Sequence, residues 1–442
     1  MKAVKRILAF LQNDIYYYLC LGLIVLAYDL NLGLNIFLYV LFIINLGANI
    51  RKESVLYTFF ALVFFEVQVH SDLVLSGWMF TSLVQVYYIV FAVRVIIDVC
   101  KKSKYKLDVI AILLALWFAA TAVRYQTDFS SGVVFMVKNA AVVLYILFYL
   151  KANVERNRAL GGLLGVIALF TLFAGVYALT RSIYWDNRLC STIHDPNYSA
   201  MFYGLGLFAS LGATLFKKWL KIVISVCLSG LLLFTMSITG IFLTGIILVV
   251  YFLMTKGIKR VAIVVGILVA LLAGILLMPT REGTAFYNLQ NRINKFYVID
   301  ESDYTLVGHD DYTKTQLYLN YITNNRYYLT QAYKETFSKL PTEEKLFGGN
   351  NVMTGEYRDQ LVAQYSTVSH NSYIDMAFMV GLVFTAVLIL LILLRMGQLI
   401  KEYRKSRSRQ VLCLLLLKAV VIIFGLTISY FPYRYFIVFM LL

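Results

Sequence analysis

The chain has 442 residues, of which 60% are hydrophobic and only 14% are charged, and its formal net charge is +16. A soluble domain carries about a quarter charged residues, so this composition excludes an ordinary soluble protein. The apolar residues fall into blocks of about 20, the length of helix that crosses a hydrocarbon core of about 30 Å. Strands of a membrane barrel would alternate apolar and polar residues instead, so we expect an all-α membrane protein.

The positive charge is distributed regularly along the chain. More than half of the 40 Lys and Arg residues lie in short connections beside apolar blocks, and these basic connections recur at every second position. According to the positive-inside rule, such connections stay in the cytoplasm. The net charge therefore indicates membrane topology, and we expect no nucleic-acid partner.

Placing the basic connections inside predicts a polytopic integral membrane helix bundle with about 13–14 spans and the N-terminus inside. The expected spans are 14–30, 33–49, 54–70, 78–99, 107–123, 132–150, 159–180, 198–215, 220–237, 239–255, 261–278, 372–394 and 411–428. The pattern leaves open whether the short final block, 431–442, also crosses. The chain then divides into a transmembrane bundle over 1–278, an extracytoplasmic loop domain over 279–371 and C-terminal transmembrane helices over 372–442.

Five cysteines are spread singly along the chain, at positions 20, 100, 190, 227 and 413. None shows the CxxC or Cys/His spacing of a zinc site, and only Cys190 falls in a predicted extracytoplasmic segment, so we expect no intramolecular disulfide framework. We also expect no metal and no cofactor. The side chains suited to chemistry gather in the long loop and in the connection near residue 190.

The loop 279–371 is the longest connection, and its composition differs from that of the membrane blocks. It is hydrophilic, yet it contains eleven of the chain's 33 tyrosines. A structureless loop of this length is uncommon unless it is functional, and the aromatic content disfavours disorder. Residues 325–340 predict an amphipathic helix that ends before Pro341, because apolar residues recur there at helical spacing. These residues are Leu329, Tyr333, Phe337 and Leu340.

Two residues near this helix have side chains suited to anion binding and proton transfer. Arg326 lies in the first turn of the predicted helix, where a guanidinium and free backbone N–H groups can bind a phosphate. His370 precedes the next membrane helix, with Asn371 or Ser372 as the expected cap, and the positive end of a helix keeps an imidazole neutral and able to act as a general base. The alternatives are a solvated arginine and an interfacial histidine that only contacts the cap.

Further candidates lie in outer connections, where positive charge runs against the topological rule. Arg181 and Arg188 flank Trp185 in a connection that enters a helix at Asn197 or Tyr198, and Arg281 opens the long loop. These arginines would bind either anionic lipid headgroups or a lipid-linked pyrophosphate. Tyrosines of the loop helix would either stack on sugar rings or pack the loop domain. The tyrosines that we single out are Tyr327 and Tyr333.

The order of four stretches resembles the O-antigen ligase and polymerase superfamily of bacterial membrane enzymes. These stretches are HDPNYSAMFYG (194–204), SITGIFLTG (237–245), NRYYLTQAYKETFSKLPTEEKLFGGN (325–350) and SHNSYIDMAFMVGL (369–382). The likeness covers roughly residues 160–395. One position departs from the family pattern, because Ile238 stands where the family usually has arginine, and Arg181, Arg188 or Arg281 would have to supply that charge.

The resemblance implies a metal-independent, inverting glycosyltransferase of the bacterial cytoplasmic membrane, with its active site on the extracytoplasmic face. Arg326 would bind the donor pyrophosphate and His370 would help to activate the acceptor hydroxyl, while Asn197 would contribute to substrate binding. The implied partners are an oligosaccharide on undecaprenyl pyrophosphate, membrane lipids and other polysaccharide-assembly proteins such as a chain-length regulator. We expect a polymerase of surface polysaccharide: O-antigen, capsule or exopolysaccharide.

Three alternatives remain open at this level. A ligase would pass the finished glycan to a lipid A core or another terminal acceptor, and the sequence does not separate it from a polymerase. A transporter of lipid-linked oligosaccharide could have a similar number of spans, although transporters often show paired halves that are not visible here. A membrane scaffold would only recruit partners through the loop, and it would tolerate the loss of His370.

Overall fold

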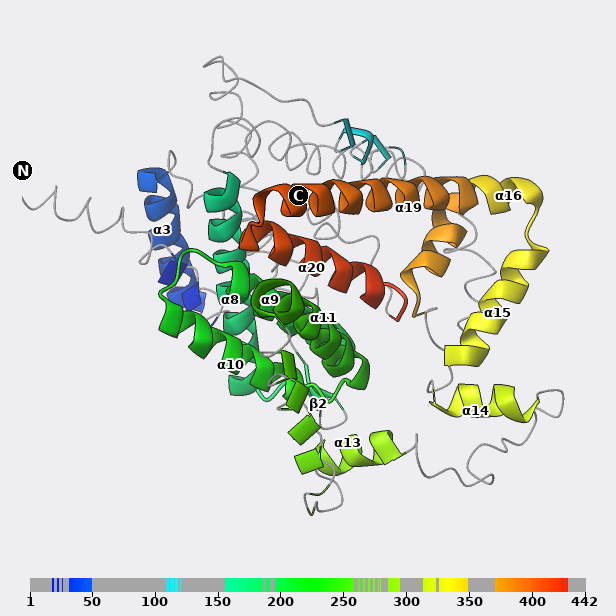
Figure 1. Cartoon of the computed structure of the whole chain (residues 1–442), viewed down its shortest axis with the longest axis horizontal. Coiled ribbons are helices and arrows are strands. Elements are labelled where there is room, and N and C mark those ends of the chain that lie inside the picture. Colours follow the sequence, from blue (N-terminus) through cyan, green and yellow to red (C-terminus); the bar gives the residue numbers. More distant parts are fainter. Residues whose placement is uncertain are drawn as a thin grey trace, which may run out of the picture.

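A computed structural model of the 442-residue chain gives the fold. It describes residues 32–49, 156–185, 188–190, 195–257, 285–294, 313–322, 326–348 and 370–427, together with scattered residues within 18–26, 109–120 and 261–279. The described residues are mostly helical (Figure 1). The expected blocks 54–70, 78–99, 132–150 and 431–442 lie outside them, and the blocks 14–30, 107–123 and 261–278 are described only in part.

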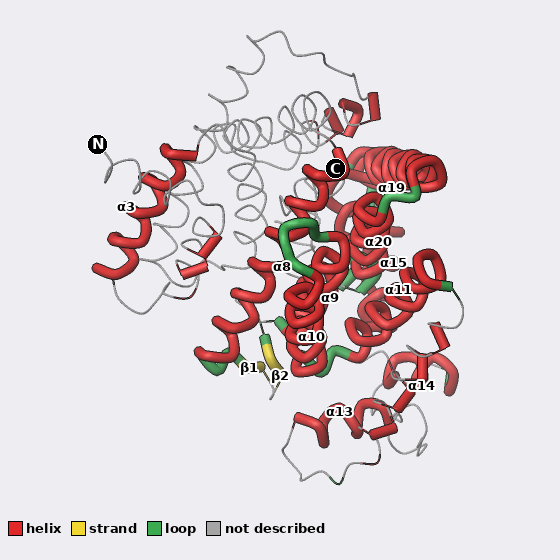
Figure 2. The backbone as a smooth tube through the Cα atoms, turned by 60° about the vertical axis from the view of Figure 1, so that its left-hand side comes forward, coloured by secondary structure: helices red, strands yellow, loops and turns green. Residues whose placement is uncertain are grey.

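The described helices that fall in predicted apolar blocks begin within three residues of the predicted starts, and segment 279–371 contains shorter helices. They are α3 (Leu32–Asn49), α8 (Arg156–Thr180), α9 (Pro196–Gly212), α10 (Lys218–Phe234), α11 (Ile238–Lys256), α13 (Ala285–Asn294), α14 (Lys314–Ile322), α15 (Arg326–Lys339), α16 (Thr342–Phe347), α19 (Ser372–Ser406) and α20 (Arg409–Phe424). Two short antiparallel strands, β1 (Tyr184–Trp185) and β2 (Arg188–Leu189), connect α8 to α9 and lie at the edge of the bundle (Figure 2).

Polar side chains fix the starts of several helices. The carboxylate of Asp195 accepts hydrogen bonds from the backbone of Asn197 and Tyr198, and Pro196 occupies the first helical position of α9. Proline suits that position because its missing N–H has no helical partner to lose. The sequence interpretation placed this start at Asn197 or Tyr198, and it was wrong by one or two residues because the Asp-Pro pair is itself the start signal.

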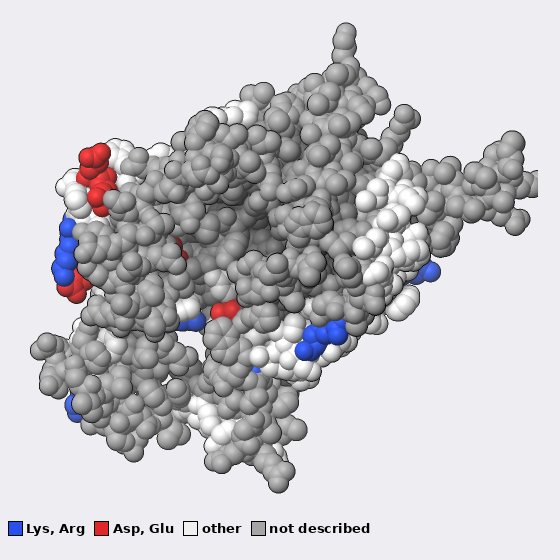
Figure 3. Space-filling view, turned by 180° about the vertical axis from the view of Figure 1, so that it is seen from behind, with Lys and Arg blue, Asp and Glu red and all other residues white. Residues whose placement is uncertain are grey.

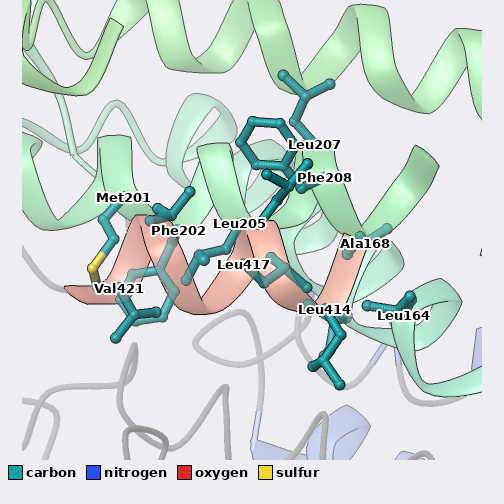
Figure 4. Packing of buried hydrophobic residues seen from close by; sticks show 14 of the residues in the cluster. Leu164, Ala168, Met201, Phe202, Leu205, Leu207, Phe208, Leu414, Leu417 and Val421 are labelled. Atoms are coloured by element: carbon teal, nitrogen blue, oxygen red, sulfur yellow. The ribbon is translucent and has the colours of Figure 1, made fainter. Parts of the chain in front are cut away.

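Helix α9 forms the centre of the described bundle. It contacts α8, α10, α11 and α20, and most of its residues are buried. Phe202 and Leu205 of α9 belong to the same buried cluster as Leu417 and Val421 of α20 (Figure 4). Glycine allows the close approach of α8, because a Cβ on Gly206 would lie 2.7 Å from Cβ of Thr171. Small residues at helix contacts are typical of packing between membrane helices.

Three described helices are long and apolar enough to cross a membrane. By length and composition these spans are Leu160–Thr180, Ile238–Thr255 and Ser372–Ser406. The outward faces of the bundle are also apolar. On α10, Trp219, Ile222 and Val226 are exposed at helical spacing, and on α11 Phe242 and Ile246 are exposed. Exposed apolar stripes of this kind are typical of helices whose solvent is lipid.

Two hydrogen bonds join α19 to neighbouring helices, one near each of its ends. At one end, the backbone N–H of Ser372 donates to the carbonyl of Gly425, which joins the start of α19 to the end of α20. At the other end, the hydroxyl of Tyr403 donates to the carbonyl of Met254, so α19 and α11 meet near their C-termini. Arg326 and Asp195 lie near the first of these ends, because their charges act on His370, two residues before Ser372.

Segment 279–371 contains short helices among its described residues, and one of them packs on a membrane-type helix. The apolar face of α15 forms a second core cluster with the first part of α19, through Leu329, Tyr333 and Phe378. The predicted helix 325–340 is confirmed as α15. In the view of Figure 3, acidic and basic side chains lie side by side at the edge of the molecule that carries α15 and α16.

Helix α19 differs from the prediction in two ways. It continues to Ser406, well past the expected end at residue 394, because polar residues such as Gln398 and Glu402 continue the helix beyond the apolar block. It is also broken at Gly381, where the backbone is left-handed with φ 82°. In Figure 1 the second part of α19 runs nearly in line with α16, and the first part turns away.

Candidate functional site

His370 lies directly before α19, and local hydrogen bonds define its position. The side chain of Asn371 caps the helix by accepting from the backbone N–H groups of Tyr373 and Ile374, at 3.0 Å and 3.2 Å. His370 itself has a left-handed backbone with φ 53°. Histidine adopts this conformation more readily than most residues. The cap predicted at Asn371 or Ser372 is therefore Asn371, and the imidazole lies half-buried in front of the helix.

Charges from two distant segments act on this imidazole. Burial lowers the pKa of His370 below the ordinary value of 6.5, the positive charge of Arg326 lowers it further, and the negative charge of Asp195 raises it. Arg326 is the first residue of α15, and Asp195 caps α9. The three residues come from the loop helix, from the connection after α8 and from the start of α19. Near neutral pH the ring is uncharged and able to accept a proton.

A second group of polar residues lies beside Asp195, in the first turn of α9. Nη2 of Arg188 donates to Oδ1 of Asn197 over 3.1 Å, and the hydroxyl of Ser237 donates to the same oxygen over 2.9 Å. Nε of Arg188 also donates to the carbonyl of Thr235 over 3.0 Å. Asn197 thereby joins the strand that carries Arg188 to the turn that precedes α11. Arg188 is 8% exposed, so these bonds fix a largely buried cation.

The position of Arg188 bears on the missing family arginine. Ser237 caps α11, and its Oγ accepts from the backbone N–H of Gly240. Ile238 is the first residue of that helix, three positions after the carbonyl that binds Arg188. The guanidinium of Arg188 therefore lies beside the turn that carries Ile238. A cation is present in that region of space although the local motif lacks one.

The remaining sequence candidates have different surroundings. The guanidinium of Arg181 lies over the ring of Tyr177, 5.9 Å from its centroid. Tyr333 is 6% exposed, and its ring packs edge-on against Phe378 in the core cluster. Tyr327 is partly exposed and lies beside Tyr328, with 6.2 Å between ring centroids. Arg281 lies outside the described residues.

Two residues of this site were not singled out from the sequence. Asp195 caps α9, and its negative charge acts on His370. The Asp-Pro pair in HDPN is the sequence signal that could have identified this cap. Ser237 binds Asn197, and no local pattern predicts a contact between the two segments. Among the described residues, no group of three or more His, Cys, Asp or Glu side chains is placed to hold a metal ion.

The fold and the site define a mostly helical protein with membrane-type helices and a polar cluster where several helices begin. The members of this cluster are Arg188, Asp195, Asn197, Ser237, Arg326 and His370. No model of a known protein family matches the chain, and no curated protein matches it.

Proposed function

We propose that the protein is a glycosyltransferase of the bacterial cytoplasmic membrane that polymerises surface polysaccharide. The donor is a glycan on undecaprenyl pyrophosphate, and the acceptor is a sugar hydroxyl of a second lipid-linked repeat unit. The observation that carries the proposal is the position of Arg326 at the start of α15, where its charge lowers the pKa of His370, together with the largely buried Arg188 of β2, which binds Asn197 in the first turn of α9. This combination of a neutral base with fixed cations suits transfer from a pyrophosphate leaving group.

The proposed reaction assigns one role to each group. Neutral His370 takes the proton of the acceptor hydroxyl while that oxygen attacks the anomeric carbon of the donor. The bond from this carbon to the pyrophosphate oxygen breaks with inversion, and the electron pair leaves with the lipid pyrophosphate. Arg326 and Arg188 stabilise the negative charge that develops on this leaving group. Asp195 stabilises the imidazolium until its proton is passed on to water.

The membrane setting supports the same reaction. A lipid-linked donor lies in the bilayer with its pyrophosphate at the surface, where the starts of membrane helices meet polar groups. In the predicted topology, His370, Arg326 and the 181–197 connection all face the outside of the cell. The apolar outward faces of α10 and α11 support membrane burial of the bundle that carries these groups.

The test is a transfer assay with purified protein and lipid-linked repeat units, without nucleotide or added metal. We expect a ladder of longer products from the wild type and none from Arg326→Ala or His370→Ala, at equal membrane abundance. Lys334→Ala is the matched control for Arg326, because Lys334 is an exposed cation on the same helix. Wild-type ladders from both variants contradict the proposal.

The products also separate the alternatives. Single transfer to a lipid A core, without chain extension, identifies a ligase. Intact substrate recovered across the bilayer of a sealed vesicle identifies a transporter. Unchanged substrate on the original side contradicts all three functions and favours a scaffold.

A further inference from the structure

Two glycines from segments far apart in the sequence meet backbone to backbone. Gly348 ends α16 with φ 72°, and Gly381 breaks α19 with φ 82°. A Cβ on Gly348 would lie 2.5 Å from the carbonyl oxygen of Met379, and a Cβ on Gly381 would overlap the carbonyl oxygen of Leu346. Both positions therefore require glycine twice over, for the left-handed backbone and for the close approach.

The contact joins two helical arms. One arm is α15 with α16, which leads from Arg326 to Gly348, and the other is the first part of α19, which leads from His370 to Gly381. Phe378 packs between the arms, with 5.6 Å from its ring centroid to that of Tyr333 and 5.1 Å to that of Phe337. The two glycines lie at the joined ends of the arms, and the two candidate catalytic residues lie at the other ends.

The contact between Gly348 and Gly381, called the joint below, must be precise because the arms are long. Helix α15 has 14 residues and spans about 20 Å at about 1.5 Å per residue. A rotation of α15 by about 10° about its C-terminal end would move Arg326 by about 3.5 Å over that length. A misplacement of about 1 Å in a catalytic group can already cost on the order of hundredfold in rate. The joint must therefore be fixed closely if Arg326 and His370 are to act on one molecule.

We propose that Gly348 and Gly381 are positioning residues, whose backbone contact fixes the two arms so that Arg326 and His370 face the same substrate. This inference rests on the proposed function for the identity of that substrate. The arrangement of the arms can nevertheless be tested without any transfer reaction. The chemical reactivity of His370 supplies the measurement, because among the described residues Arg326 and Asp195 are the charged groups that act on its ring.

The experiment measures modification of His370 by diethyl pyrocarbonate across pH, with mass spectrometry of the peptide that carries residue 370. The reagent modifies the neutral imidazole, so the midpoint of the curve gives the pKa of His370. Arg326→Gln removes the cation that lowers this pKa, so the midpoint should move upward. The shift in this variant is the largest that a displaced Arg326 could cause. We expect Gly348→Ala and Gly381→Ala to shift the midpoint in the same direction. Gly381→Ala added to Arg326→Gln should give no further shift.

Two glycines serve as matched controls. Gly257 also has a left-handed backbone, with φ 78°, and Gly397 lies in the second part of α19. A Cβ on either residue would meet nothing within 4 Å. Gly257→Ala places alanine at a left-handed backbone position where its Cβ meets no other atom. Gly397→Ala places alanine in α19 away from the joint. Both should keep the wild-type midpoint. In the transfer assay, the two joint variants should lose about hundredfold in kcat.

Phe378→Leu provides a second route if alanine at the joint prevents folding. It removes the ring contacts with Tyr333 and Phe337 without any backbone overlap. An upward midpoint shift in this variant supports the inference. Wild-type midpoints in Phe378→Leu and in every folded joint variant overturn it. An upward shift in the joint variants, when the wild-type protein itself shows no transfer activity, supports the joint and contradicts the proposed function alone.

Discussion

The hydroxyl of Ser237 donates a hydrogen bond of 2.9 Å to Oδ1 of Asn197, which joins the turn before α11 to the first turn of α9. The same oxygen accepts from Arg188 over 3.1 Å. The side chain at position 197 therefore accepts two hydrogen bonds. A negative charge on this side chain would neutralise Arg188 and weaken its attraction for an anionic ligand.

Asn197→Asp keeps the acceptor and adds a negative charge. We expect the fold to persist, because a carboxylate near the start of a helix is favourable. The new carboxylate would pair with Arg188, so the KM for the lipid-pyrophosphate donor should rise by about tenfold, which corresponds to about 1.4 kcal/mol. Steady-state kinetics of the purified variant measure this. An unchanged donor KM would argue that Arg188 acts only in the fold.

Asn197→Ala separates the structural role from the electrostatic one. It leaves the donors of Arg188 and Ser237 without their shared acceptor. Loss of a partner for buried polar groups costs about 1–3 kcal/mol. Thermal unfolding in detergent should therefore show a lower midpoint for Asn197→Ala and a near wild-type midpoint for Asn197→Asp.

Asp195→Asn should change the pH dependence of the reaction. The negative charge of Asp195 raises the pKa of His370, so its removal lowers that pKa further. A general base works when deprotonated, and activity therefore rises as pH rises through this pKa. We expect the acidic limb of kcat/KM to move to lower pH. Asparagine caps helices about as well as aspartate, so α9 should remain intact.

The control for this prediction is Asp195→Ala, which loses both the charge and the cap of α9. It should show the same displacement of the acidic limb together with a stability loss of about 1 kcal/mol. An acidic limb that stays in place in both variants would mean that His370 is not the group whose titration limits the rate.

Much of the fold was predictable from local pattern, because hydrophobic blocks and capping residues act over a few positions. The apolar blocks predicted the membrane-type helices, and the spacing of Leu329, Tyr333 and Leu340 predicted the face of α15 that packs on α19. The break at Gly381 was not predicted, because a single glycine in an apolar run gives the same local signal whether or not another backbone approaches it.

The candidate site was predictable in its residue types and less so in its contacts. Arg326 and His370 were selected from helix starts, and the structure places the charge of one within range of the other. The sequence offered Arg181, Arg188 and Arg281 as replacements for the family arginine. Arg188 is favoured only by its contacts with Asn197 and Thr235 in the structure. Contacts of this kind depend on how separate helices pack, which a local sequence window does not contain.

Phe378→Ala should destabilise the contact between the loop and α19. Phe378 is 2% exposed, and its ring touches Tyr333 and Phe337. Removal of a buried phenylalanine ring costs about 3–5 kcal/mol. We expect protease cleavage between α15 and α16 to become much faster. Phe242→Ala is the control, since Phe242 on α11 is 66% exposed and should tolerate the change in detergent. Equal cleavage rates in the two variants would contradict the packing.

Gly206→Leu should disrupt the packing of α9 on α8. A Cβ at this position would already lie 2.7 Å from Cβ of Thr171, so a leucine has no room. Overpacking of this kind costs about 1–3 kcal/mol, and the folded yield in membranes should fall. Gly230→Leu on α10 is the matched control, because a Cβ there would meet nothing within 4 Å. Equal yields of both variants would contradict the close approach of α8 and α9.

Labelling of single cysteines should place the loop outside the cell. Lys339 ends α15 and has an exposed side chain, and Arg407 follows α19 and is also exposed. The proposed donor is used on the outer face, so residue 339 must be accessible there, while the basic segment around residue 407 should be inside. In a background without native cysteines, a membrane-impermeant maleimide should label Lys339→Cys in intact cells.

The same reagent should reach Arg407→Cys only after permeabilisation, because α19 has the length and composition of a membrane span and separates the two positions. A helix of 35 residues, at about 1.5 Å per residue, is longer than the hydrocarbon core of about 30 Å even with its break at Gly381. Labelling of both positions from outside would mean that α19 does not cross. The reverse pattern would put His370 and Arg326 in the cytoplasm, where an outer-face polymerase cannot use them.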